Sequence, residues 1–502
     1  MGTAGSDGSQ GNYAALTKKL TDNIELIKTV FKNDSTLVTR SFESQFEPNL
    51  KYCIFYSDGM VNNKILNEDI IKPLLEYRPE KKESDLINAL AKQIIFSNSV
   101  EITTEMEKII QGIIYGDTVL FTDGYAEALI LNTKGWSIRS TSEPENEKVL
   151  KGPREGFTEA LLTNLSMIRR RIRTPELKME YQTFGTRTKT QACICYMEDL
   201  VNTDVLEELR KRLESFTIDG VLDVNYINEF IRDAPYSPIK TVGETERPDV
   251  VVAKLLEGRV ALLLDGTPVA LTVPHLFIEH FQSDEDYYIN FYFSSIGRIL
   301  RLMAFFVSTS VPALYVALTT FHQEMLPTSL VISISMARQG VPFPTVVEAV
   351  LMLVVFEMLR ESGARMPGMM GQALSIVGAL VVGQAAVSAK IVSAPMIIIV
   401  GITGISGLMV PRIKGASIVT RFALLGLASI FGFYGYMFGF LVLMMHLFSI
   451  SSFGIPIMSS VYTNGAQDRK DIAIRAPWWK MQKRPKYLSP NTTRVSVKGG
   501  SK

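Results

Sequence analysis

The fold of this chain is decided by an uncharged stretch of twenty residues, Leu302–Phe321, whose sequence is LMAFFVSTSVPALYVALTTF. As a helix, twenty residues span about 30 Å, which is the thickness of the hydrocarbon core of a bilayer. Charged residues are frequent before this stretch, whereas residues 299–462 are almost wholly apolar. We therefore expect a soluble part followed by a helical membrane part.

Three further uncharged runs lie downstream, at residues 366–389, 391–411 and 422–467. The last of these is long enough for one tilted helix or for two crossings. Two shorter segments precede them. Leu326–Ala337 is too short to cross and has prolines at its boundaries, which is typical of a half-helix, and Thr345–Arg360 is charged and amphipathic. The pattern predicts four to six crossings.

The membrane part keeps most of its acids and bases in one proline-punctuated stretch, residues 321–368. A charge at mid-bilayer depth costs at least about 2–3 kcal/mol unless it is paired or hydrated, so these residues need a local explanation. On a helix Glu357, Arg360 and Glu361 share a face, and Glu348 lies on a similar azimuth. Such a stripe lines a hydrated pathway or fastens helices together through ion pairs, and spacing alone leaves both interpretations open.

The soluble part contains an internal repeat, in which two pairs of segments match: Lys51–Asn62 with Gln191–Asn202, and Gly116–Ile130 with Gly258–Thr272. Both members of the second pair carry an Asp-Gly turn between β-rich runs, which predicts a hairpin. A helix is expected after each first strand, at Asn67–Glu76 and at Asp204–Ser215. Two similar α/β subdomains are the economical interpretation.

The predicted fold class is thus a duplicated α/β cytosolic domain followed by an α-helical multi-pass membrane domain. The expected segments are a flexible N-terminal tail at 1–35, α/β subdomains at 36–145 and 146–298, a transmembrane helical domain at 299–465, and a basic C-terminal cytosolic tail at 466–502. The first tail is expected to be flexible because its Gly/Ser-rich start buries little apolar area.

Three observations favour a cytosolic location for both ends of the chain. The three cysteines, Cys53, Cys193 and Cys195, lack metal-ligand spacing and indicate reduced, buried thiols. The N-terminus has no secretory signal. The C-terminal tail is basic and contains the adjacent Trp478 and Trp479, a composition that favours the cytosolic interface. The number of crossings is therefore expected to be even.

A basic run at Arg169–Arg173 lies between the repeated units. It is interpreted either as a contact for anionic lipid headgroups or as a solvated helix face.

Several classes of function are disfavoured. The net charge of +1, without a basic arm, argues against a nucleic-acid partner. The chain has no phosphate loop, zinc spacing or nucleophile elbow, so we expect neither an enzyme nor a cofactor. His275 and His280 lie five residues apart, which is a poor spacing for a shared metal on one helix face, and no metal site is expected.

Four segments of the membrane part closely resemble the GerA spore germination family: Phe321–Leu330, Arg338–Pro344, Phe356–Gly368 and Ser375–Val387. The resemblance extends to the Ala476-Pro-Trp-Trp-Lys tail and fits the duplicated cytosolic domain of germinant-receptor A subunits. Two positions depart from the family pattern. Lys390 stands where a small residue is expected, and Ser362 stands where alanine is common.

The resemblance implies a membrane subunit of a nutrient-responsive germinant receptor, in the inner membrane of the spore or the cell membrane, with its N-terminal domain cytoplasmic. Its implied partners are a transporter-like B subunit that binds the nutrient, a lipoprotein C subunit and membrane lipids. The A subunit is expected to form a ring-like homo-oligomer, of which a pentamer is one candidate form, that conducts ions when triggered.

Ten residues are candidates for a pore or gate: Glu324, Pro327, Arg338, Pro342, Pro344, Glu348, Glu357, Arg360, Glu361 and Arg365. Four more are candidates for close helix packing, namely Gly371, Gly378, Gly383 and Gln384. Two other functions stay open. One is an accessory A-like protein of the dipicolinate release channel, and the other is a non-conducting membrane scaffold whose charges serve only as ion pairs.

Overall fold

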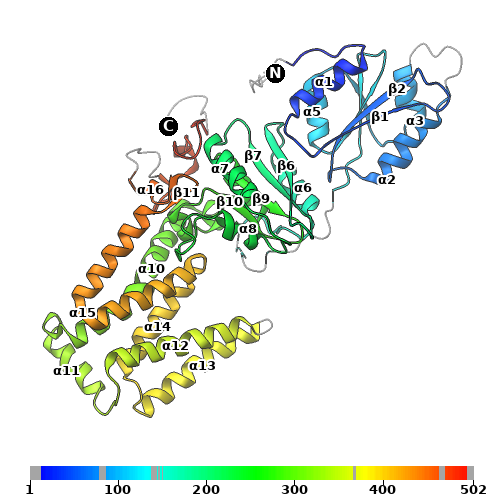
Figure 1. The fold of residues 1–502 in the computed structure, drawn as a ribbon. Coiled ribbons are helices and arrows are strands. Elements are labelled where there is room, and N and C mark those ends of the chain that lie inside the picture. Colours follow the sequence, from blue (N-terminus) through cyan, green and yellow to red (C-terminus); the bar gives the residue numbers. More distant parts are fainter. Residues whose placement is uncertain are drawn as a thin grey trace, which may run out of the picture. The chain divides into compact units, whose positions relative to one another are not determined.

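The computed structural model describes residues 13–78, 86–136, 144, 147, 149, 151–365, 369–462 and 470–494 (Figure 1). Residues 1–12, 366–368, 466–469 and 495–502, which belong to the predicted tails and to the charged stretch, lie outside the described residues. The chain divides into two units. Unit 1 comprises residues 1–232, 242–274 and 484–493, and unit 2 comprises residues 233–241, 275–483 and 494–502.

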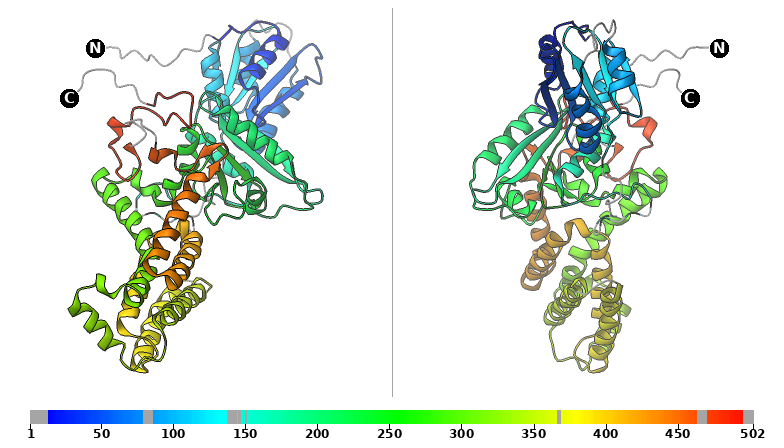
Figure 2. Two further views of the ribbon diagram at one scale, coloured as in Figure 1. Left: turned by 60° about the vertical axis from the view of Figure 1, so that its left-hand side comes forward. Right: turned by 90° about the vertical axis from the view of Figure 1, so that its right-hand side faces the viewer.

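The first half of unit 1 is a five-stranded antiparallel sheet with helices on both faces (Figure 2). Its order is β1-β2-β4-β5-β3, with strands Leu37–Glu43 (β1), Lys51–Ser57 (β2), Val100–Thr103 (β3), Thr118–Thr122 (β4) and Ala128–Leu131 (β5). The helices are Leu20–Val30 (α1), Asn63–Ile65 (α2), Lys72–Glu76 (α3), Leu86–Ala89 (α4) and Met106–Ile114 (α5), with π-helical turns Leu66–Ile71 and Leu90–Ile94. Alternate residues of β2 are buried on opposite faces of the sheet. Cys53 and Phe55 pack against α1 and α5, whereas Tyr52 and Ile54 pack against the helices on the other face.

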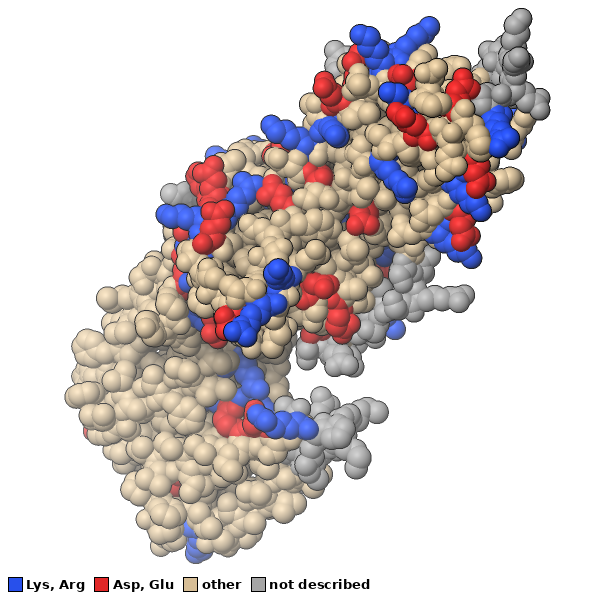
Figure 3. Space-filling model, turned by 45° about the vertical axis from the view of Figure 1, so that its right-hand side comes forward, with Lys and Arg blue, Asp and Glu red and all other residues tan. Residues whose placement is uncertain are grey.

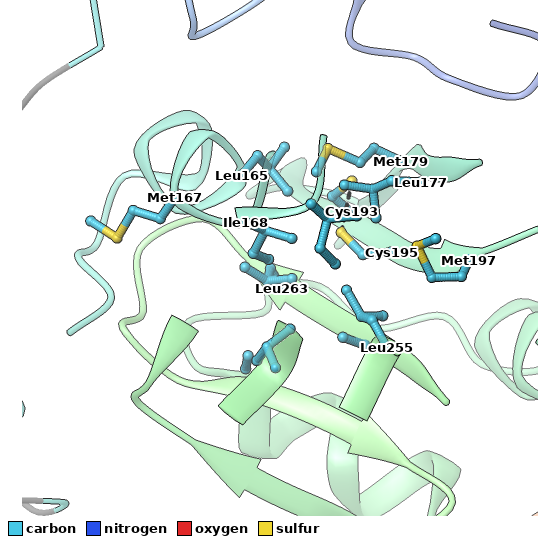
Figure 4. Close-up of a cluster of buried hydrophobic side chains, with 14 of the residues drawn as sticks. Leu165, Met167, Ile168, Leu177, Met179, Cys193, Cys195, Met197, Leu255 and Leu263 are labelled. Carbon is cyan, nitrogen blue, oxygen red and sulfur yellow. Dashed lines mark hydrogen bonds between the residues drawn. The ribbon is translucent and has the colours of Figure 1, made fainter. Parts of the chain in front are cut away.

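The second half of unit 1 is a five-stranded sheet with the order β6-β7-β9-β10-β8. Its strands are Leu177–Phe184 (β6), Thr190–Met197 (β7), Gly243–Thr245 (β8), Val260–Leu264 (β9) and Ala270–Val273 (β10), and its helices are Leu161–Arg171 (α6), Thr203–Glu214 (α7), Val224–Ile231 (α8) and Pro248–Leu255 (α9). Figure 4 shows the core between α6, α9 and the sheet, where Cys193 and Cys195 point toward Leu165, Ile168 and Leu255.

The two sheets share one strand order and one set of local contacts. Each Asp-Gly turn presents its aspartate to the first N–H of a helix, Asp123 to Leu20 at 3.1 Å and Asp265 to Leu161 at 3.0 Å. The predicted strand at residues 51–62 and its repeat are central strands β2 and β7, and the predicted hairpins are β4–β5 and β9–β10. The predicted helices at Asn67–Glu76 and Asp204–Ser215 are present as well, within one or two turns of the expected bounds.

The expectation of a flexible tail at 1–35 is wrong for its second half. Residues 20–30 form α1, and Leu20 and Ile27 are buried in the core beneath β2. The helix has only 11 residues, so its own sequence predicts it weakly. It is held by the sheet, and the aspartate contact that starts it comes from a residue 103 positions away.

Unit 2 consists mainly of apolar helices (Figure 1). They are Phe291–Thr320 (α10), Thr328–Ala337 (α11), Thr345–Ala364 (α12), Met369–Ser388 (α13), Ala394–Leu408 (α14) and Lys414–Ser449 (α15). The predicted half-helix is α11, which is short and begins after Pro327. Two helices of the described residues are long and apolar enough to cross a membrane, Phe291–Thr320 and Pro411–Ser449. Figure 3 shows that the helical surface carries few Lys, Arg, Asp or Glu side chains.

Helix α15 is interrupted at Gly432, whose φ of 61° and ψ of −142° are not helical. The two arms, residues 414–431 and 433–449, fold back on each other, because a Cβ at Gly439 would meet the Leu424 and Leu427 side chains at 2.9 and 2.8 Å. The sequence left one tilted helix or two crossings open for this run, and the chain forms two helical arms.

The last part of unit 2 packs against the start of α10. The 3₁₀ turn Asp284–Tyr287 (η4) precedes α10, and the tail contributes the 3₁₀ turn Trp478–Lys480 (η8). Unit 2 begins its main segment at His275, earlier than the boundary of 299 expected from hydropathy, because residues 275–290 pack with the helices rather than with the sheets.

Candidate functional site

The first cluster of the candidate site is built around Glu348, near the start of α12. Its carboxylate is buried and accepts hydrogen bonds from the backbone N–H and the hydroxyl of Ser393, at 2.9 and 2.8 Å. Arg338, which follows α11, lies 3.3 Å from its other oxygen. The cluster therefore joins the ends of α11 and α12 to the residue before α14.

The second cluster is built around Glu357, in the middle of α12. One carboxylate oxygen accepts a hydrogen bond of 2.9 Å from Arg421 on the first arm of α15, and the other is paired with Arg360 on the next turn of α12. Arg421 is almost wholly buried, with 1% of its side chain exposed. A buried guanidinium is tolerated in an apolar helical unit only when its donors are used, and here two of its nitrogens have acceptors.

The other acceptor for Arg421 exists because of a proline. Pro312 lies inside α10 and has no N–H, so the carbonyl of Ser308, four residues earlier, has no helical partner. The Nε of Arg421 donates to that carbonyl at 2.6 Å. Arg421 therefore satisfies a defect in α10 and a carboxylate in α12 together, and it joins three helices.

The remaining charged candidates lie on the surface of unit 2. Glu361 and Arg365 pair at 2.8 Å across one turn at the end of α12, with 58% and 79% of their side chains exposed. Glu324 is exposed in the short turn Gln323–Met325 after α10. Arg365 is the residue that follows the last turn of α12, and the described chain resumes at Met369.

Helix α11 has no buried residue in this unit. Its apolar residues Leu330, Ile332 and Met336 are exposed, and so are the hydroxyl residues Ser329 and Ser333. Pro327 is the residue before the helix, and Pro344 is the residue before α12. Pro342, like Pro344, is exposed in the connection between these two helices.

The acidic residues of α12 thus do not act as one stripe. Glu348 and Glu357 turn inward to different partners, and Glu361 is exposed. The sequence pattern missed Arg421 and Ser393, which lie outside residues 321–368. A signal for Arg421 was present, because it is the only charged residue between Lys414 and Asp468.

The packing candidates lie where α13 meets its neighbours. A Cβ at Gly378 would lie 3.2 Å from Leu359 of α12, and one at Gly383 would lie 3.6 Å from Ile397 of α14. Gly371 lies in the first turn of α13, and Gln384 is exposed. The tightest contact in this region was missed by the sequence. It is made by Gly404 of α14, where a Cβ would lie 2.3 Å from the ring of Phe356.

Lys390, the departure noted in the sequence, occupies the turn between α13 and α14 with a φ of 56°. Its side chain lies against Gly340, whose φ of 89° requires glycine or costs strain. The lysine therefore belongs to a turn and not to the buried part of a helix.

The basic run at Arg169–Arg173 is engaged within unit 1, although Arg173 is exposed. Arg169 is buried and pairs with Asp34 at 2.6 Å, which joins the two halves of unit 1. The guanidinium of Arg173 lies 4.1 Å from the ring centre of Tyr115, and Arg171 pairs with Glu155. These arginines are used within unit 1, a role that the charge pattern alone does not reveal.

His275 and His280 come together edge to face, with ring centroids 4.8 Å apart and an angle of 78° between the ring planes. Burial holds the pKa of His280 well below its usual value, and the neighbouring His275 lowers it further. Among the described residues, no group of three His, Cys, Asp or Glu side chains is placed to hold a metal ion.

Similarity to known proteins covers nearly the whole chain. The family described as Bacillus/Clostridium GerA spore germination protein matches residues 25–487. An uncharacterized membrane protein of Bacillus subtilis (strain 168), YfkQ, is 42% identical over 475 residues, which are 94% of this chain and 91% of that protein. Spore germination protein KA of the same organism is 40% identical over 94% of this chain and 87% of that protein. Spore germination protein GerLA of Bacillus cereus is 32% identical over 97% of this chain and 98% of that protein.

A crystal structure of a related N-terminal domain is also similar to part of this chain. It is the crystal structure of the N-terminal domain of the A subunit of the Bacillus megaterium spore germinant receptor GerK3. It is 30% identical, covers 53% of this chain and 99% of that chain, and aligns with a TM-score of 0.43.

Proposed function

This chain belongs to the GerA family of spore germination proteins, and we propose on that premise that it is the A subunit of a nutrient-responsive germinant receptor. The observation that carries the proposal is the family match over residues 25–487, together with relatives named as spore germination proteins along nearly their full length. The proposed location is the inner membrane of the spore or the cell membrane.

The contacts within unit 2 support a proposed topology. The break in α15 packs against Phe321 and His322, so it lies level with the end of α10. Arg412, just before α15, pairs with Asp284 at 2.8 Å, so the start of α15 lies level with the start of α10. The first arm of α15 thus runs back along α10, and the second arm returns.

We infer four crossings from α10, α14 and the two arms of α15, with α12 and α13 adding either none or two. Both counts are even, which puts the C-terminal tail on the same side as unit 1. We propose that this side is the cytoplasm. The shared strand order and turn contacts of the two sheets further support the interpretation of unit 1 as a duplicated α/β domain.

The proposed oligomer is a ring in which α11 and α12 line a conducting path. Helix α11 has no buried residue within one chain and presents Ser329 and Ser333, whose hydroxyls suit a hydrated lining. The exposed Glu324 and Glu361 would raise the local cation concentration. A neighbouring copy would cover the apolar side of α11.

The proposed trigger is a nutrient bound by a B subunit, with a lipoprotein C subunit completing the receptor. A ligand can shift the ring only if it changes contacts between subunits, and unit 1 and the short membrane loops are the available surfaces.

The experiment is ion flux through proteoliposomes that contain the chain co-purified with its B and C partners. Monovalent cations are expected to pass after nutrient is added. Glu361→Gln combined with Glu324→Gln is expected to lower cation flux at low salt, because these carboxylates are exposed. Glu357→Gln is expected to alter rate or selectivity, and unchanged currents would remove Glu357 from the path. The absence of nutrient-dependent flux in every preparation would overturn the proposal that the protein forms a channel.

A second candidate, a non-conducting scaffold, is favoured by one observation. Glu348 and Glu357, the two most buried acids of α12, are both engaged in ion pairs that join helices. In that case the double carboxylate variant would leave germination unchanged, while loss of Arg421 would prevent assembly of the receptor.

An accessory A-like protein of the dipicolinate release channel is the alternative within the family. The neighbouring genes separate the two, since a receptor A subunit is expected beside genes for B and C subunits.

A further inference from the structure

The tail segment at residues 470–483 is fixed against the start of α10 by buried charges. Arg298 of α10 is almost wholly buried and donates to Asp286 at 2.9 Å and to Asp471 at 2.6 Å. The hydroxyl of Tyr287 donates to the same aspartate at 2.7 Å. Moving the tail would leave these buried charges without partners, which costs free energy. The network therefore fixes the position of the tail.

Arg475 continues this attachment on the next part of the tail. Its backbone N–H donates to the hydroxyl of Ser295 at 3.1 Å, and its guanidinium donates to the carbonyl of Ile289 at 3.1 Å. The ring of Trp479 lies edge-on to Phe291, with centroids 6.0 Å apart. The tail therefore lies along the first turns of α10.

What the network presents outward is aromatic and apolar. Trp479 is 63% exposed, Ile474 is 64% exposed, and Tyr292 and Phe293 are each 69% exposed. Trp478, also exposed, stands beside Tyr287. We call the six residues Tyr292, Phe293, Ile474, Trp478, Trp479 and Lys480 the interfacial collar. Large aromatic side chains exposed together on one surface mark an interaction site.

The length of α10 places the collar at the edge of the bilayer. Thirty residues rise about 45 Å, which is the thickness of a bilayer with its headgroup layers. The uncharged stretch begins at Leu302, so the turns that carry Tyr292 and Phe293 extend beyond the hydrocarbon. Tryptophan and tyrosine favour this interfacial layer, where one side of the ring is apolar and the other is hydrated.

The charge of the segment selects among lipids. Apart from Arg475, which is buried in the attachment, residues 470–483 contain three basic side chains, Lys470, Lys480 and Lys483, and one acidic side chain, Asp471, which is paired with Arg298. Lys480 is exposed directly after the tryptophan pair. We propose that the interfacial collar lies in the headgroup layer and binds anionic phospholipid headgroups, so that the tail is a peripheral membrane anchor in addition to the crossing helices. The proposal rests on membrane insertion of α10 and does not depend on ion conduction.

The chain offers its own probe, because it contains only three tryptophans, and Trp136 lies in unit 1. The full-length protein with Trp136→Phe, in proteoliposomes, reports on the collar alone. Bromine on lipid acyl chains close to the glycerol is expected to quench this emission more than bromine near the chain ends. The difference between wild type and W478F/W479F isolates the same signal with Trp136 intact, should the first variant fold poorly.

Headgroup preference is tested with brominated phosphatidylglycerol against brominated phosphatidylcholine, in vesicles of otherwise equal composition. The anionic lipid is expected to be enriched around the collar by roughly fivefold for each basic residue near the surface. Lys480→Glu with Lys483→Glu should abolish the preference while the shallow quenching persists. Equal quenching by both lipids in the wild type would overturn the anionic preference. Two results would overturn the proposed position of the collar in the headgroup layer. Quenching by aqueous acrylamide but by no brominated lipid would place the tryptophans in water. Quenching by neither acrylamide nor lipid would indicate that a protein partner covers them.

Discussion

At the scale of single residues, the helical unit depends on a few buried charges whose partners come from distant parts of the sequence. Glu357 and Arg421 are separated by 64 positions, and Arg421 also reaches the Ser308 carbonyl, 113 positions away. Spacing within one helix predicted that α12 carries functional charges. It could not reveal which partner each charge meets, because the partners are fixed only when α10, α12 and α15 pack.

Arg421→Met is expected to destabilise the protein by about 3–5 kcal/mol, because it leaves the partly buried Glu357 carboxylate with one partner and the buried Ser308 carbonyl with none. Thermal unfolding of the purified protein in detergent measures the loss. Arg365→Met is the matched control, since that arginine is exposed and its pair contributes about 0–1 kcal/mol. Equal shifts for the two variants would contradict the role assigned to Arg421.

His280 is expected to make the stability of the folded protein depend on pH. Its pKa in the folded state is below the unfolded value because burial disfavours the imidazolium. The unfolded chain therefore binds more protons than the folded chain once the pH falls below about 6.5, and stability present above that pH is lost as the pH falls. The unfolding midpoint should fall as the pH is lowered from about 7.5 to about 5.5. His280→Gln should flatten this dependence, and an unchanged slope in that variant would assign it to another group.

At the scale of elements, sequence periodicity predicted the units of structure well where apolar residues mark them. The hairpins β4–β5 and β9–β10 follow from their Asp-Gly turns, and α11 follows from its length and its flanking prolines. The packing of helix α1 was missed because its attachment to the sheet is tertiary. The break in α15 was left open because hydropathy is uniform across Gly432, and only its packing against Phe321 requires the turn.

Gly432→Ala is expected to destabilise the protein by about 1–3 kcal/mol. Its backbone occupies a region that favours glycine, and a Cβ would lie 2.8 Å from the Cβ of Phe321. Gly426→Ala is the control in the same helix, because a Cβ there has no heavy atom within 4 Å, and it should stabilise by about 0.5–1 kcal/mol. Thermal unfolding of both variants decides the matter. A neutral Gly432→Ala would mean that α15 runs straight in solution.

At the scale of the whole molecule, composition alone separated a charged, cysteine-containing part from an apolar one. The exact boundary differed, because residues 275–290 are polar in composition but pack with the helices. Composition predicted only a soluble part and a membrane part, whereas the family resemblance predicted the function in germination. The geometry then added what neither supplied, namely that the two most buried acids of α12 are paired and that α11 has no buried residue.

The proposed topology predicts the side of the membrane from which a membrane-impermeant maleimide reaches cysteines introduced at two glutamine positions. Gln323→Cys, after α10, and Gln482→Cys, in the tail, should be labelled from opposite sides of sealed vesicles. The native thiols should stay silent, because all three are buried and burial raises the pKa of Cys53 and Cys193. Labelling of both engineered cysteines from one side would exclude an even number of crossings that begins with α10.

The proline in α10 is also tolerated only because Arg421 is present. A proline acquired while position 421 lacked a donor would have left the Ser308 carbonyl orphaned among apolar side chains, whereas an arginine acquired first could serve Glu357 and wait. Arg421 is thus a permissive residue for Pro312. Substitutions should obey the same order, so that Pro312→Ala leaves the helices packed, whereas variants that keep the proline but lose the arginine are destabilised.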